Sequence, residues 1–134
     1  MGSKGQVTIE FLLVFSAILI FISFFIGLFP VFENASIFAI DSQNAKTFIS
    51  DITYSANTLA LLSDGSKKHF EYSILNKWEI NDFQNKKVLL VNSGINTVSF
   101  SFPSTVKVIL ENKSFTNKIS VFLKKENGLI VLSE

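Results

Sequence analysis

The sequence predicts an α+β fold: a long N-terminal hydrophobic α-helix, followed by an antiparallel β-sheet head that packs on the C-terminal half of the helix. Three observations predict this fold. Residues 6–32 place large apolar side chains on every face of a helix, with no charged residue from Phe11 to Phe32. Residues 33–64 keep helical spacing but become amphipathic. From residue 65 the apolar pattern changes to period two, as strands require.

Composition excludes several classes of function. The chain has 134 residues, with 12 lysines, no arginine and 11 acidic residues, so its formal net charge is +1. This balance provides no electrostatic surface for nucleic acid, and the usual reader of phosphates and guanine is missing. Cysteine is absent, which excludes disulfides and thiolate metal sites. The sequence therefore predicts no nucleic-acid partner, no metal and no cofactor.

The apolar segment 6–32 must be buried on all sides, by lipid or by other protein, because it has no polar face. It is long enough to cross a bilayer, which needs roughly 20 apolar residues. It is too long for a secretory signal, and Pro-Val-Phe-Glu-Asn after it is a poor cleavage site, so we expect the segment to be retained. Lys4 before the span favours a cytoplasmic N-terminus and an exported C-terminal part.

The first residues carry a short motif. Residues 1–5 read Met-Gly-Ser-Lys-Gly, and Gln6, Thr8, Glu10 and Val14 follow. This order resembles archaeal type IV pilins with a class III signal peptide. In that family a prepilin peptidase cuts after a Gly and before a Gln, and Ser, Glu and Leu stand where this chain has Thr8, Glu10 and Val14. The resemblance implies leader-peptidase processing at Lys4, Gly5, Gln6 and Thr8.

The resemblance also implies how the chain is divided. Residues 1–5 would be the leader, and residues 6–32 a hydrophobic helix that spans the membrane and later forms the filament core. Residues 33–64 would continue the helix in amphipathic form, with Ser63-Asp64-Gly65 as its stop. A single helix from Gln6 to Leu62 would be about 85 Å long. Residues 65–134 would form the β head.

Glu10, at the edge of the apolar segment, has two interpretations. It is either an interfacial acid in contact with water or a partner for the ammonium group that cleavage would create at Gln6 of a neighbouring subunit. The second arrangement would fix the register of a filament, because a slip leaves a buried charge unpaired. In pilins the acid at this position is thought to have that role. Cyclisation of an N-terminal Gln6 would remove the ammonium, and the sequence leaves both forms open.

Small residues interrupt the apolar segment. Ser16, Ser23 and Gly27 fall on roughly one face, where they either let another helix approach closely or share a face by chance. We assign Ser23 and Gly27, with Glu10, to filament assembly.

Pro30 lacks an amide hydrogen, so we expect a kink or a local break just before it. In the amphipathic part, Ala45, Phe48 and Ile52 mark the buried face, while Asp41 and Asp51 are assigned to the other faces.

The pattern after residue 65 predicts a meandering antiparallel sheet of five or six strands. They are expected at residues 69–74, 87–91, 97–102, 106–110, 119–123 and 129–132, with turns at 92–94, 111–114 and 126–128. Trp78, Phe83, Phe100 and Phe102 are interpreted as core or interface aromatics. The lysine pairs 67–68, 86–87 and 124–125 are interpreted as solvated turn ends that protect sheet edges, with adhesion to an anionic surface as the alternative.

We find no motif for catalysis. His69 is the only histidine, and no nucleophile elbow, phosphate loop or dinucleotide fingerprint is present, so we expect a protein that is not an enzyme. Asn34 and Asn112 each begin an Asn-x-Ser sequon and are candidates for N-glycosylation if exported, with Asn112 favoured because it lies in an expected turn.

These expectations describe a structural pilin subunit that is first held in the cell membrane and then assembled into an extracellular filament, with surface adhesion as its expected role. The resemblance implies identical subunits, a prepilin peptidase, an assembly ATPase and a membrane platform as partners. A minor pilin or pseudopilin that primes assembly or carries a binding function is one alternative. A single-span membrane-anchored binding protein that never polymerises is the other.

Overall fold

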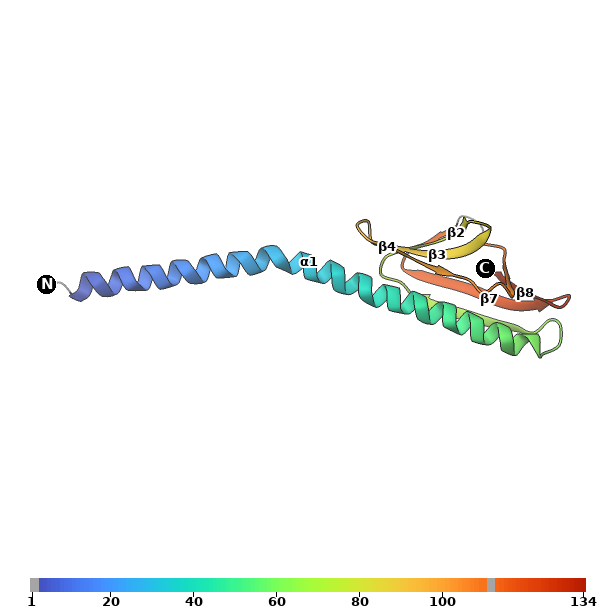
Figure 1. Cartoon of the computed structure of the whole chain (residues 1–134). Coiled ribbons are helices and arrows are strands. Elements are labelled where there is room, and N and C mark those ends of the chain that lie inside the picture. The colour runs from blue at the N-terminus through green and yellow to red at the C-terminus, as the bar shows by residue number, and fades with distance from the viewer. Residues whose placement is uncertain (1–2, 111–112) are drawn as a thin grey trace. The chain divides into compact units, whose positions relative to one another are not determined.

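The computed structural model describes the backbone of residues 3–110 and 113–134, with side chains from residue 6 onward in these ranges. The chain divides into two compact units, one ending at Ala35 and one comprising Ser36–Glu134. The long helix α1, Ser3–Ala60, provides all of the described first unit and the start of the second. Eight strands, β1 to β8, follow in the part of the chain that the structure describes. Figure 1 labels five of them. The α+β fold with a long N-terminal apolar helix is confirmed.

Helix α1 is continuous through Pro30. The helix therefore has no local break before this residue, whereas a kink, the other expected form, is compatible with a continuous helix and stays a prediction. Proline removes one amide hydrogen and crowds the preceding turn, but the neighbouring residues keep helical conformation here. The helix ends at Ala60, and Leu61 and Leu62 continue as a turn through hydrogen bonds from their amides to the carbonyls of Thr58 and Leu59.

The head contains two four-stranded sheets, whereas a single sheet of five or six strands was expected. The first has the order β1-β7-β8-β5, with β1 Lys67–Ser73, β7 Lys118–Glu126, β8 Leu129–Ser133 and β5 Val106–Val108. The second has the order β4-β3-β2-β6, with β4 Thr97–Ser101, β3 Lys86–Asn92, β2 Lys77–Phe83 and β6 Lys113–Phe115. Pairing is antiparallel except between β5 and β8, which is parallel, so the head is mixed rather than purely antiparallel.

Two strands, β2 and β6, were not predicted. Strand β2 buries Trp78 and Ile80 on one face, but polar residues occupy most of its other positions and hide the alternation. Strand β6 has only three residues, and its Lys113 and Ser114 were assigned to a turn. Pairing with β2 extends these residues, with Trp78 opposite Phe115. Tertiary pairing thus overrides a weak local signal.

The hairpin turns depend on residues with positive φ. Asn127 and Gly128, with φ values of 51° and 77°, join β7 to β8 and confirm the expected hairpin. Gln84 and Asn85, with φ values of 49° and 62°, join β2 to β3. Two consecutive left-handed residues match the right-handed twist of the strands they connect. The second turn contains no glycine and was not predicted.

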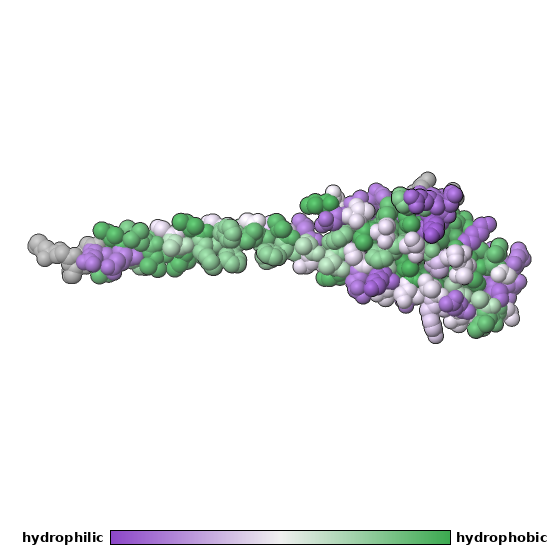
Figure 2. Space-filling model, in the orientation of Figure 1, coloured by the Kyte–Doolittle hydropathy of each residue, from purple (hydrophilic) through white to green (hydrophobic). Residues whose placement is uncertain are grey.

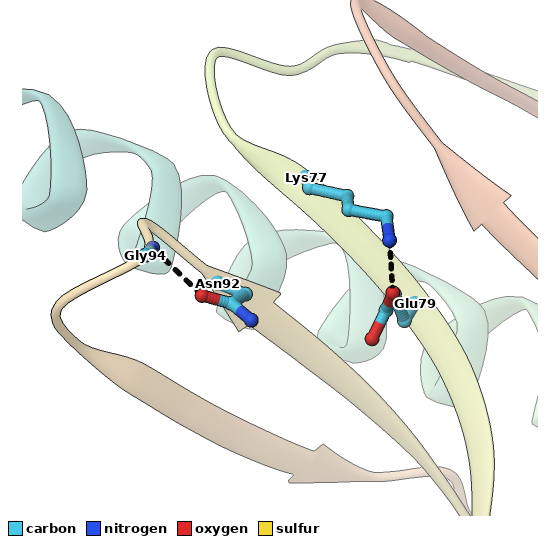
Figure 3. A network of polar contacts seen from close by, with 4 residues as sticks. All are labelled: Lys77, Glu79, Asn92 and Gly94. Atoms are coloured by element: carbon cyan, nitrogen blue, oxygen red, sulfur yellow. Dashed lines mark hydrogen bonds and ion pairs between the residues drawn. The ribbon is translucent and has the colours of Figure 1, made fainter.

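The turn after β3 is closed by a side chain. The Asn92 side-chain oxygen accepts the Gly94 amide at 2.7 Å, and the Ser93 amide donates to the Asn96 carbonyl at 3.0 Å. This confirms the turn expected at residues 92–94. On the neighbouring strand β2, Lys77 and Glu79 form an ion pair of 2.5 Å (Figure 3). Both contacts lie at the end of the second sheet.

One buried cluster joins the helical part of the second unit to both sheets. Phe48 lies at its centre and contacts the rings of Phe70, Tyr72, Trp78 and Phe102, with centroids 5.4–6.5 Å apart. Trp78 and Phe102 are buried, as expected for core aromatics, and Phe100 packs partly buried against them. Phe83 is 62% exposed and does not belong to the core.

Candidate functional site

The N-terminal unit exposes an unusual amount of apolar surface. Apart from the partly buried Leu28, its large apolar side chains from Val7 to Phe32 are between 47% and 71% exposed. Figure 2 shows apolar residues along the visible face of this segment. Full burial of one such side chain is worth about 1.5–3 kcal/mol, so this surface is strongly unfavourable in water. By length and composition, α1 could cross a membrane. The segment can therefore serve as a membrane anchor, and its surface requires lipid or protein around it.

The expected processing residues lie at the start of α1. Because the helix begins at Ser3, the Gly5–Gln6 peptide bond lies in its first turn. A protease binds its substrate in extended form, so cleavage before Gln6 requires this turn to unwind. Gly5 lowers the cost, since glycine is about 1 kcal/mol less favourable than alanine in a helix. The side chain of Lys4 is not among those that the structure describes.

Gln6 and Glu10 lie one helical turn apart and are in contact. The Gln6 side-chain amide donates to the Glu10 carboxylate at 3.4 Å, and both residues are exposed. Thr8 lies between them and also takes part in a polar interaction. A carboxylate has about four lone-pair sites, so this contact leaves Glu10 able to accept a further donor. The structure therefore brings Gln6 and Glu10 together within one chain.

The small residues assigned to assembly, Ser23 and Gly27, are both exposed. A Cβ atom added at Gly27 would meet no other atom within 4 Å. Packing inside the chain therefore gives no reason for glycine at this position, although glycine weakens the helix. Beside it, Phe25, Ile26, Phe29 and Pro30 line an apolar hollow of about 450 Å³. Together these features fit the close approach of a second helix.

Asp41 was assigned to a polar face of the helix, and that assignment was wrong. Its side chain is fully buried. It accepts hydrogen bonds from the Leu75 amide at 3.2 Å, the Asn76 amide at 2.9 Å and the Trp78 indole at 2.9 Å. The signal was available, because Ala45 and Phe48 follow Asp41 by one and two helical turns on the same face. Asp41 fastens α1 to the connection between β1 and β2.

Two further contacts join the helix to the head. The Tyr72 hydroxyl donates a hydrogen bond to the Asp51 carboxylate. Burial is the main cause that raises the pKa of Tyr72 to about 12, and this hydrogen bond is the next cause. At the end of α1, the Lys125 ammonium donates to the carbonyls of Ala60 at 2.9 Å and Leu62 at 2.6 Å. These carbonyls have no partner inside the helix, so the lysine acts as a C-terminal cap.

His69, the only histidine of the chain, lies on β1 beside residues of β7. The His69 Nε2 lies 2.9 Å from the Ser120 hydroxyl, and the imidazole stacks on Phe122 with ring centroids 4.6 Å apart. On the same strand, the hydrogen bond from Lys118 lowers the pKa of the Glu71 carboxyl. Within residues 3–110 and 113–134, no three histidine or acidic side chains lie close enough to hold a metal ion.

Of the two sequons, the one that begins at Asn34 lies within the described residues. Asn34 is exposed and lies inside α1. Sequon acceptors are usually found in surface loops, so the helical setting of Asn34 differs from the usual one. Asn112 lies outside the described residues.

The lysine pairs assigned to turn ends have different contacts. The Lys68 ammonium donates to Ser55 at 2.8 Å, and Lys124 pairs with Glu126 at 2.5 Å. Lys87 pairs with Asp82 at 2.5 Å.

Comparison of the chain with family models, with curated proteins and with solved structures finds no match.

Proposed function

We propose that this chain is a structural subunit of an extracellular type IV pilus-like filament. It is processed before Gln6 and polymerises through its hydrophobic N-terminal helix, and the filament serves surface adhesion. The observation that carries the proposal is the apolar surface of residues 7–32, which is exposed on all faces of α1. One chain cannot cover this surface, but a membrane and then a bundle of identical helices can cover it in turn.

The exchange of lipid for neighbouring helices has no large hydrophobic driving force, because lipid tails are as apolar as leucine. Close packing and polar pairs must therefore favour the filament. The bare backbone at Gly27 and the adjacent hollow at Phe25, Ile26, Phe29 and Pro30 suit close packing. Glu10 supplies the polar pair: its carboxylate would accept the Gln6 ammonium of a neighbouring subunit and so fix the axial register.

The proposal implies a route with two locations and several partners. The precursor sits in the cell membrane, where a prepilin peptidase removes residues 1–5. A membrane platform and an assembly ATPase then move the subunit into the filament outside the cell. The head, whose core lies entirely within Ser36–Glu134, can stay folded through both steps because none of its buried residues comes from the apolar segment.

The N-terminus of the native protein in its own cell envelope tests the proposal. Intact-mass and N-terminal peptide mapping should show a chain that starts at Gln6, open or cyclised. Electron microscopy of sheared surface material should then show filaments that contain it. A chain that starts at Met1 or Gly2 in cells with an active prepilin peptidase would contradict the proposal and favour a single-span membrane-anchored binding protein. Processed chains at low copy number in filaments made of another subunit would instead identify a minor pilin or pseudopilin.

A further inference from the structure

The head contains an open pocket of about 530 Å³, within the range of small-molecule binding sites. Three segments form it. The β2–β3 hairpin contributes Asp82 and residues 85–87, the end of β4 and the following turn contribute residues 101–104, and β5 contributes residues 106–108. All belong to the compact unit Ser36–Glu134. Figure 2 shows hydrophilic side chains over the part of the head where Figure 1 places the turn between β2 and β3.

The lining of this pocket is positively charged. Lys86, Lys87 and Lys107 line it, against the single described acid Asp82, which pairs with Lys87 at 2.5 Å. Four other lysines of the head have acidic partners, in the pairs Lys77–Glu79, Lys113–Glu134, Lys118–Glu71 and Lys124–Glu126. Lys86 and Lys107 are exposed, and neither forms an ion pair with any residue that the structure describes. Two unneutralised ammonium groups thus face one concave surface, where an anion would bind favourably.

The remaining lining narrows the class of anion. Ser101, Ser104 and Asn85 offer hydroxyl and amide groups, and Pro103 offers a partly buried apolar surface. Asp82 has a side chain that is 57% exposed and can accept hydrogen bonds from a ligand. A carboxylate inside the pocket repels a chain of phosphates but suits hydroxyl groups that need acceptors. The lining therefore fits a ligand with one negative charge, several hydroxyls and an apolar ring face.

We propose that this pocket binds an acidic saccharide, a pyranose that carries a carboxylate. Lys86 and Lys107 contact the carboxylate, Asp82 and the serine hydroxyls contact the ring hydroxyls, and Pro103 lies against the apolar face of the ring. This binding does not depend on filament assembly, and it would give the head a chemical target for adhesion.

Nuclear magnetic resonance of the labelled full chain in neutral detergent micelles tests the proposal, with D-glucuronate as the probe and D-glucose as the neutral match. Glucuronate should shift the backbone signals of the pocket segments in a saturable way, with a weak dissociation constant on the order of millimolar. Replacing both free lysines (Lys86→Gln and Lys107→Gln) should weaken binding by about fivefold or more. Lys46→Gln, an exposed lysine of α1 outside the pocket, is the matched control and should leave the constant unchanged.

Several outcomes would overturn the assignment. Equal affinity for glucose would show that the lysines do not select the ligand, and equal glucuronate affinity of the double variant would show that binding occurs elsewhere. Inorganic phosphate that displaces glucuronate at equal concentration would show a general anion site rather than a saccharide site. A lack of saturable shifts in the pocket segments would remove the site altogether. None of these results bears on processing at Gln6 or on filament formation.

Discussion

At the scale of single residues, Asp41 is an ionisable side chain that the fold buries completely. Its carboxylate accepts three donors in a site without exposure to water. Removing a hydrogen-bonded carboxylate from such a site leaves buried donors without a partner, which costs several kcal/mol in total. The head thus depends on one acid that composition alone does not distinguish from the other ten.

The substitution Asp41→Asn tests this dependence. The asparagine side chain accepts hydrogen bonds only through its oxygen, and its NH2 group would face the backbone amides and the indole that now donate to Asp41. The free energy of unfolding should therefore fall by about 3 kcal/mol. Denaturant unfolding of the full chain in neutral detergent, followed by Trp78 fluorescence, measures it. Asp82→Asn, at an exposed ion pair, should cost less than about 1 kcal/mol. Equal costs for the two variants would contradict the role of Asp41.

Tyr72 predicts a pH dependence at the alkaline end. Its pKa in the folded chain is raised to about 12 from 10, so the folded state holds the proton more tightly than the unfolded state. The resulting stability is complete below pH 10 and is lost as the pH rises toward 12. Because Tyr72 is only half-buried, solvent screening limits the expected loss to about 1 kcal/mol.

The measurement compares the free energy of unfolding of the native chain with that of Tyr72→Phe between pH 9 and pH 12. The native chain should lose its advantage over the variant across this interval. Tyr54→Phe, at a tyrosine that is 73% exposed, should show a constant difference. A constant difference for Tyr72→Phe as well would show that its hydroxyl ionises without hindrance.

At the scale of elements, the end of α1 relies on a side chain from a distant strand. Lys125 of β7 donates to the carbonyls of Ala60 and Leu62, where the helix dipole also favours a cation. Lys125→Met should lower the free energy of unfolding by about 1 kcal/mol, measured by denaturant unfolding. The adjacent Lys124→Met removes only an exposed ion pair with Glu126 and should change it by less than about 0.5 kcal/mol.

The open backbone at Gly27 predicts a separation of folding from assembly. Gly27 is exposed, and a Cβ atom added there finds no atom within 4 Å outside its own helical turn, so the head and the processing at Gln6 should be unaffected by Gly27→Leu. The amount of filament on the cell surface should fall by about tenfold, because the larger side chain keeps a second helix away. Ala17→Leu, an exposed position on another face of α1, is the control. Filament yields that fall equally in both variants would point to general crowding instead.

The sequence predicts the elements well where one periodicity dominates. The apolar run, the amphipathic helix and the strands β3, β4, β7 and β8 all follow from spacing, and the Asn127-Gly128 turn follows from its residue types. Strand β2 and the Gln84-Asn85 turn could not be predicted in this way. Their conformation is set by pairing with β3 and β6, which local sequence does not report. The parallel β5–β8 pair is likewise a property of the tertiary fold.

The candidate site likewise has parts that the sequence predicts and parts that it does not. The first turn and the apolar surface could be predicted because they depend on residue order and hydropathy along one helix. The burial of Asp41 and the pocket beside Lys86 and Lys107 could not, because each combines segments that are distant in the sequence. The helical spacing from Asp41 to Phe48 indicates a buried position. Acidic side chains are rarely buried, however, and this general preference favoured the wrong face.

At the scale of the whole molecule, the two compact units have separate requirements. Every buried side chain of the core belongs to the unit Ser36–Glu134, while the apolar surface belongs to the unit before it. A fragment comprising Ser36–Glu134 should therefore be a monomer in water, with a cooperative unfolding transition. Analytical ultracentrifugation and thermal denaturation measure this, with the full chain as the control that requires detergent. An aggregated or unfolded fragment would show that the head needs the N-terminal unit.

The clamp at Asp41 has a mechanical consequence for a chain that is pulled through its helix. Tension that enters the head along α1 from residue 36 meets Asp41 as the first buried side chain. Its three hydrogen bonds converge on one carboxylate, so they bear a shearing force together instead of breaking one after another. The chain has no cysteine and thus no disulfide for this purpose. Asp41 and the turn that encloses it would therefore carry load before the contacts of Asp51 and Lys125 further along the helix.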